Sequence, residues 1–186
     1  MHSVLSFLKV FRAIIYTTVM LIPIKVTATT LNFSAVLTNV TCSISLDKSL
    51  LSLGSISIGQ FRPETLINVQ PFILSVQNCA GTAGGNDIPI VMIRGEGITQ
   101  DNKWLFRKSD SANNVGIMVI KSDVSPSYNQ PEITNETALT LSAAGKIPTD
   151  QQYTFYAGAS CGGTSGCSNV GVGSVTASLY FTFEYQ

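Results

Sequence analysis

Histidine is almost absent from this 186-residue sequence, in which the only one is His2. Serine and cysteine nucleophiles usually need a neighbouring imidazole, and imidazole is also a common zinc ligand. Charged side chains are scarce too, at 12% of residues, and the acidic ones are scattered along the chain without a catalytic motif. We therefore expect a protein that is not an enzyme and that holds no metal or other cofactor.

The first 28 residues have the layout of a secretory signal peptide. Lys9 and Arg12 form a basic region, an apolar run follows over 13–24, and the small residues Val26 and Ala28 precede the expected cleavage site. A transmembrane helix needs about 20 apolar residues, so the run is short for an uncleaved anchor, which is the alternative. Cleavage would leave 158 residues, enough for one domain with a real core.

Removal of this segment also changes the charge balance. It takes away three of the 11 basic residues (Lys9, Arg12 and Lys25), the single histidine and none of the 11 acids, which leaves a net charge of −3. A weakly acidic chain without a basic patch gives no reason to expect nucleic acid or an anionic membrane surface as a partner.

The four cysteines, Cys42, Cys79, Cys161 and Cys167, are an even number in a chain that we expect to be exported, and this favours two disulfides. Of the three pairings, we favour Cys42 with Cys79 and Cys161 with Cys167, because the short glycine-rich loop of the second pair lets its ends meet. A four-thiolate zinc site is the competing interpretation, but the closely spaced cysteine pairs typical of such sites are missing.

The clearest periodicity lies at the end of the sequence. Over 174–186, every odd-numbered residue from Val175 to Tyr185 is apolar, and the even positions carry Ser, Thr, Tyr, Glu or Gln. A two-residue period indicates a half-buried β-strand. Because this strand comes last, any strand that pairs with its free edge has to come from earlier in the chain or from another molecule.

Short strand-like stretches separated by turn residues recur through the rest of the chain, and no twelve-residue stretch after residue 28 has helical periodicity. The stretches are 29–41, 43–46, 51–58, 72–79 (following Pro71), 88–92, 115–120, 139–141 and 153–157. The run 115–120 is apolar throughout, as expected of a strand buried on both faces. The predicted class is all-β, as a single immunoglobulin-like sandwich.

The stretch 103–108, Lys-Trp-Leu-Phe-Arg-Lys, mixes aromatic and basic residues. It could bind a sugar or an anionic surface. We favour the alternative, in which Trp104 and Phe106 pack inward while the charges stay solvated.

In this order, four motifs resemble those of pilin subunits of bacterial fimbriae assembled by the chaperone–usher pathway. They are an alternating N-terminal arm ending at Asn39–Cys42, the segment Pro71–Cys79, the segment Ala112–Ile117 and the stretch Tyr153–Ala157. The terminal strand fits best, because Tyr185 is the penultimate residue and Gly173 is the fourteenth from the end, as in that family's chaperone-recognition motif.

The resemblance implies an incomplete immunoglobulin-like sandwich that lacks its final strand and uses residues 29–41 as an N-terminal donor-strand extension, with the pilin domain spanning 42–186. In the family, a periplasmic chaperone first fills the groove left by the missing strand, an outer-membrane usher assembles the subunits, and the arm of the next subunit then replaces the chaperone. By similarity, the donor residues are Leu31, Phe33, Ala35 and Leu37. The groove and chaperone-binding residues are Gly173, Val175, Leu179, Phe181, Phe183 and Tyr185.

The resemblance makes this chain a structural fimbrial subunit, exported through the periplasm to a fimbrium on the bacterial cell surface. Its 13-residue arm is typical of a minor or adaptor subunit. The alternative is an adhesin-type surface subunit that binds a host glycan. Two features depart from the family: Ala35 stands where glycine is usual, and Cys161 with Cys167 forms an additional pair.

Overall fold

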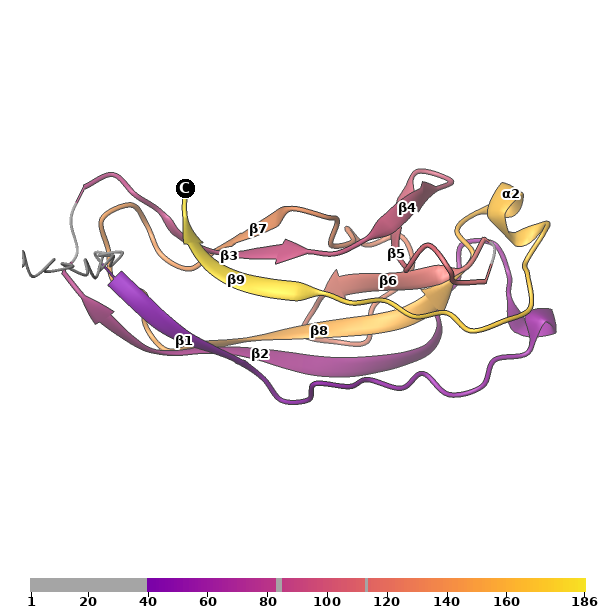
Figure 1. Cartoon of the computed structure of the whole chain (residues 1–186), viewed down its shortest axis with the longest axis horizontal. Helices are drawn as coiled ribbons and strands as arrows, with labels where there is room; N and C mark the ends of the chain where they lie inside the picture. Colours follow the sequence, from indigo (N-terminus) through magenta and orange to yellow (C-terminus); the bar gives the residue numbers. More distant parts are fainter. Residues whose placement is uncertain (1–39, 83–84, 113) are drawn as a thin grey trace, which may run out of the picture. The chain divides into compact units, whose positions relative to one another are not determined.

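The structure is a computed structural model that describes residues 40–82, 85–112 and 114–186. These residues form two antiparallel β-sheets with very little helix (Figure 1). The elements are β1 (Val40–Leu46), the 3-10 turn η1 (Ile58–Gln60), β2 (Ile67–Gly81), β3 (Pro89–Arg94), β4 (Gly97–Gln100), β5 (Lys103–Phe106), β6 (Gly116–Lys121), β7 (Thr137–Thr140), β8 (Gln151–Ser160), α2 (Thr164–Cys167) and β9 (Tyr180–Tyr185). The predicted all-β sandwich is confirmed.

One sheet has six strands in the order β1-β2-β8-β6-β5-β4, and the other has three in the order β7-β3-β9. Strand β9 therefore pairs with β3 along one edge, and no described strand pairs with its other edge. On the six-stranded sheet β1 is likewise an edge strand, paired only with β2 among the described elements.

The main core lies between the two sheets. The inward residues of β2 alternate with exposed or half-buried ones, so that Phe72, Leu74 and Val76 are buried, and Phe155 of β8 stacks on Phe72 with ring centroids 5.3 Å apart. Val91 and Ile93 of β3 complete the cluster from the opposite sheet. Alternation in these strands thus supplies one apolar face to a shared interior.

Strand β6 is buried on both faces, as its continuous apolar run predicts. Val119 belongs to the main core, whereas Met118 and Ile120 pack with Leu105 and Tyr128 in a second cluster. A strand between two clusters needs apolar side chains on both faces.

Two predicted boundaries were wrong. Strand β2 begins at Ile67 and runs through Pro71, with a register irregularity between Ile67 and Gln70 that accommodates the approach to the proline. Only Tyr180–Tyr185 of the expected terminal strand 174–186 lies in a ladder.

The hairpin β4–β5 was not predicted. Its two turn residues, Asp101 and Asn102, have φ of 49° and 63°, as a tight two-residue hairpin requires.

In the stretch 103–108, Phe106 is fully buried and Trp104 packs against the main core, as predicted. The expectation that all the charges are solvated was wrong for Lys103. Its ammonium lies 2.8 Å from the Glu132 carboxylate, and both side chains are mostly buried. Glu132 also accepts a hydrogen bond from the Trp104 backbone N–H. The pair fastens the loop before β7 to β5.

Among the described residues, no helix is long and apolar enough to cross a membrane.

Substitution Glu132→Gln should lower the free energy of unfolding by about 2–3 kcal/mol, because it leaves the Lys103 charge desolvated and unpaired. Burial raises the pKa of Glu132, but hydrogen bonds from Lys103 and the Trp104 N–H outweigh it and hold this pKa below its usual value. The stabilisation is thus present above the ordinary glutamate range and is lost as the pH falls through the lowered folded value. Urea unfolding at several pH values tests this, with the exposed Asp123→Asn as the control; equal stability of E132Q and the parent would contradict it.

Candidate functional site

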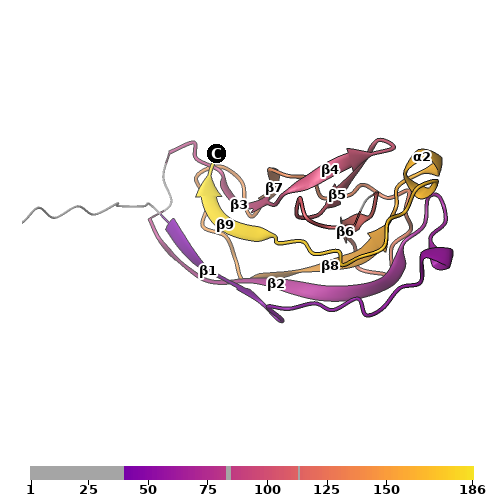
Figure 2. The ribbon, with the colours of Figure 1, turned by 45° about the vertical axis from the view of Figure 1, so that its right-hand side comes forward.

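A groove of about 680 Å³ opens along one side of the domain between two segments that are far apart in sequence. One wall is formed by the end of β1 and the chain that follows it, over 46–58, and the other by the chain that leads into β9 and the start of that strand, over 171–181. Both segments run lengthwise along the domain (Figures 1 and 2). The floor consists of apolar core residues of the six-stranded sheet: Phe72, Ile117, Val119, Ala157 and Ala159.

The wall formed by 171–181 keeps the alternation seen in the sequence without being part of a ladder over most of its length. Its odd-numbered apolar residues Val175, Ala177, Leu179 and Phe181 line the groove. All four are only half-buried, although three of them already pack against the main core. The segment therefore has the alternating sequence of a core strand, but no described strand covers its apolar face.

Hydrogen bonds from the loop that follows β5 hold this wall in place. The Ala112 N–H donates to the Ser174 carbonyl, and the Lys108 N–H donates to the Thr176 carbonyl, at 2.9 and 2.8 Å. The Ser111 hydroxyl also bridges to Thr176. These contacts replace the ladder that was expected over 174–179, which explains why β9 begins only at Tyr180.

The opposite wall resembles it in composition. Leu51, Leu53 and Ile56 are half-buried and line the groove. The strand predicted over 51–58 was wrong, because the segment joins no ladder. Leu50 is 85% exposed. Lys48 is the one charged residue among the described residues that line the groove. The site thus offers apolar surface and backbone edges, and suits an extended apolar segment more than a polar ligand.

Of the expected groove residues, the structure places Gly173, Val175, Leu179 and Phe181 in the groove lining. Phe183 and Tyr185 lie outside it. Phe183 packs against the main core and touches the Tyr185 ring edge-on, with centroids 5.3 Å apart.

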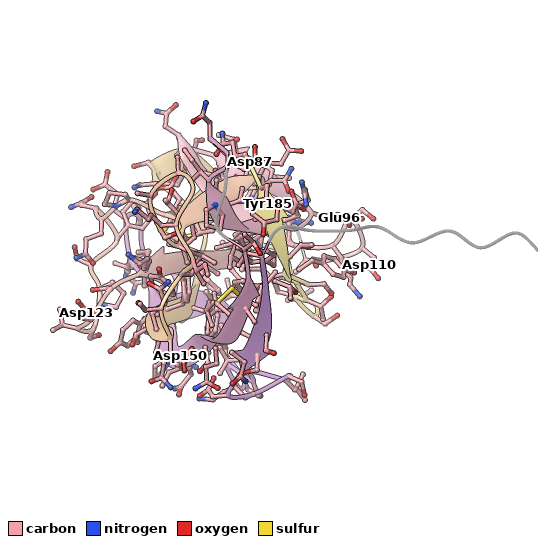
Figure 3. The ribbon with its side chains drawn as sticks, turned by 90° about the vertical axis from the view of Figure 1, so that its left-hand side faces the viewer. Asp87, Glu96, Asp110, Asp123, Asp150 and Tyr185 are labelled. Carbon is pink, nitrogen blue, oxygen red and sulfur yellow. A yellow bond between two sulfur atoms is a disulfide. The ribbon has the colours of Figure 1, made fainter. Side chains whose placement is uncertain are left out.

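Tyr185 instead ties β9 to the start of β1. Its hydroxyl donates to the Val40 carbonyl and accepts from the Val40 N–H at 2.7 Å. Figure 3 views the domain from this end, with Tyr185 beside β1. Val40 and Thr41, the last residues of the expected extension, already pair with β2.

Sequence reasoning missed several groove residues. Ala177 was seen in the alternation but not assigned to the site, and Leu51, Leu53 and Ile56 were read only as a strand. The only signal for them was the recurrence of apolar residues over 51–58. The floor residues Ile117, Ala157 and Ala159 carry no signal that separates them from ordinary core. The expected donor residues Leu31, Phe33, Ala35 and Leu37 lie outside the described residues.

Both favoured disulfides are present. Cys42–Cys79 joins β1 to β2, and Cys161–Cys167 closes a loop that contains α2. All four cysteines are therefore bonded, which overturns the zinc interpretation.

The outward face of β9 is polar. Arg94 on β3 and Glu184 on β9 form a two-pronged ion pair across the ladder. The hydrogen bonds from Arg94 lower the pKa of Glu184. Tyr180 is 66% exposed on this face and borders a separate shallow hollow with Ser178. Over 177–184 the two faces of the segment therefore differ: Ala177, Leu179, Phe181 and Phe183 pack against the main core, whereas Tyr180 and Glu184 lie on the polar outward face.

No protein-family model and no curated protein matches the sequence. Solved structures do. The structure is similar to the P pilus rod subunit PapA, with 18% sequence identity, a TM-score of 0.50, and coverage of 78% of this chain and 99% of that one. It also matches the CupB6 tip adhesin from Pseudomonas aeruginosa, with 14% identity, a TM-score of 0.44, and coverage of 78% of this chain and 42% of that one. The chain thus has the immunoglobulin-like fold of a pilus rod subunit.

An apolar groove of this kind should bind a hydrophobic dye such as anilinonaphthalene sulfonate, which fluoresces on exposed apolar surface. Substitution Ala177→Glu places a carboxylate in the groove and should reduce the fluorescence about threefold or more. The neighbouring Ser178→Glu, on the outward side, should leave it unchanged. Equal fluorescence from both variants would show that the dye binds elsewhere.

Proposed function

We propose that the chain is a structural subunit of a bacterial fimbrium that polymerises by donor-strand complementation. The observation that carries the proposal is the apolar groove between two segments that belong to no described ladder, 47–58 and 171–179. A strand placed there would bury the half-exposed residues of both walls and would bond to their free backbone groups. It would complete the sandwich.

The donor is the segment 29–41 of a neighbouring subunit. Its apolar residues Leu31, Phe33, Ala35 and Leu37 recur at every second position. The groove wall offers Val175, Ala177, Leu179 and Phe181 with the same spacing. Because successive side chains of a strand point to opposite faces, a donor with this period directs all four side chains toward the floor. Fully burying each large one is worth about 1.5–3 kcal/mol.

An uncovered groove also explains the need for a chaperone. Unpaired strand edges beside exposed apolar side chains are templates for aggregation. A periplasmic pilus chaperone would occupy the groove until an outer-membrane usher brings in the next subunit. The protein then acts without catalysis, in a surface fimbrium, and the short arm favours a minor or adaptor subunit.

A variant that carries a second copy of residues 29–41, joined by a flexible linker after Gln186, should be a stable monomer. With an effective concentration about 100-fold above the dissociation constant, the added strand stabilises the fold by about 2.7 kcal/mol. Thermal unfolding and size-exclusion chromatography measure this. The matched control has Asn in place of Leu31, Phe33 and Leu37 in the added copy only. If the control is as stable and monomeric as the intact copy, the groove does not receive this strand.

Assembly in cells should depend on which face of β9 carries a charge. Phe181→Glu places a carboxylate against Phe72 and Phe155, whose rings lie 6.2 and 6.1 Å from that of Phe181. We expect this variant to lose chaperone capture and incorporation into fibres, because a buried unpaired charge is strongly unfavourable. Tyr180→Glu, one residue away on the exposed face, should be incorporated normally. Pull-down with the chaperone and immunolabelling of fibres give the readout, and normal assembly of F181E argues against the proposal.

A further inference from the structure

The loop 161–167 lies in the chain between the end of β8 and the start of the groove wall 171–181. It is closed by the Cys161–Cys167 disulfide and contains the single turn of α2. Only residues 168–170 separate the loop from Gly171, the first groove-lining residue of that wall. The position of this loop therefore sets where the wall starts.

Asp101, in the tight turn between β4 and β5, fixes the loop from outside. Its carboxylate accepts hydrogen bonds from the Gly163 N–H at 2.7 Å, the Gly166 N–H at 2.9 Å and the Ser165 hydroxyl. All three donors belong to the seven-residue loop, so one side chain spans most of it. The Ser165 hydroxyl, then the Gly166 N–H and the Gly163 N–H, hold the pKa of Asp101 below its usual value, as expected of hydrogen bonds that favour the charged carboxylate.

The backbone of the loop also packs closely against the side chains of Gln100 and Asp101. A Cβ on Gly162 would lie 2.8 Å from Gln100 Cγ, and one on Gly163 would lie 3.0 Å from Asp101 Cβ. A Cβ on Gly166 would lie 2.7 Å from Gln100 Cγ. The three glycines let the loop approach the β4–β5 turn closely enough for the carboxylate to reach its donors.

The loop 161–167 and the short segment 168–170 that follows it are hydrogen-bonded to the surroundings of both groove walls. The Glu64 N–H donates to the Gly162 carbonyl at 2.8 Å, close after the 46–58 wall. On the other side, the Asn114 side chain donates to the Asn169 carbonyl at 3.0 Å, just before the 171–181 wall. The 171–179 part of that wall has no ladder of its own, so its placement depends on such anchors.

We propose that Asp101 is a positioning residue for the groove, which fixes the stapled loop 161–167 and so holds the wall 171–179 ready for an incoming strand. The role in strand capture rests on the proposed function. A wall that is already ordered does not lose conformational entropy on binding, and so it retains the bound strand longer.

The test compares full-length Asp101→Asn with the parent. Asparagine tolerates the positive φ of this turn position but lacks the charge and one of the two acceptor oxygens. Amide hydrogen exchange should speed up about tenfold over 162–176, the amount expected for losing one charge-assisted hydrogen bond, and should stay unchanged in β2 and β8. Release of a fluorescent peptide with the sequence 29–41 should also be about tenfold faster.

Asp123→Asn, an exposed aspartate away from the loop, is the control and should behave like the parent (Figure 3). Ser165→Ala, which removes one donor and keeps the carboxylate, should shift both readouts in the same direction by a smaller factor. It keeps the test valid if D101N does not fold. Unchanged exchange over 162–176 in both Asp101→Asn and Ser165→Ala overturns the inference. Failure of the parent itself to bind the peptide instead counts against the proposed function, while the exchange comparison still decides whether Asp101 holds the wall.

Discussion

The free edge of the wall 171–181 is the constraint on which the rest of the structure depends. Three of its apolar side chains, Ala177, Leu179 and Phe181, pack against the main core, yet each is only half-buried. At one end of the groove, Phe181 closes the gap by packing edge-on against the stacked rings of Phe72 and Phe155. Beyond that point, the groove lies open between the two walls 46–58 and 171–179. The proposed donor strand would fill this opening.

The two ends of the groove are held by different interactions. At the β9 end, the Tyr185 hydroxyl bonds both backbone groups of Val40, and the Cys42–Cys79 disulfide lies close by in the chain. At the other end, the Cys161–Cys167 loop is fixed by Asp101. Between these anchors the wall is held by hydrogen bonds of Lys108, Ser111 and Ala112 with Ser174 and Thr176. Both ends of the groove are therefore anchored, and its middle stays accessible between the two walls.

The likeness to the pilus rod subunit PapA has its basis in the fold, since only 18% of the aligned residues are identical. Many apolar sequences satisfy the same alternation, because a sandwich core requires burial at every second position more than it requires particular side chains. The groove, in contrast, is defined by the positions of this chain's own residues. For this reason the proposal of strand complementation depends on geometry rather than on sequence identity.

Alternation along the chain was enough to determine the all-β class, the core strands and the apolar face of the last segment, because a two-residue period follows from strand geometry alone. The spacing of the cysteines likewise indicated the pairing. Only the tertiary structure decided that Phe183 and Tyr185 leave the groove, that 174–179 is held by loop contacts, and that Lys103 is paired with Glu132. It also decided that 51–58 forms the second wall and that Asp101 reaches the loop 161–167. These outcomes depend on which segments meet in space, and that information is absent from the local periodicity of any one segment.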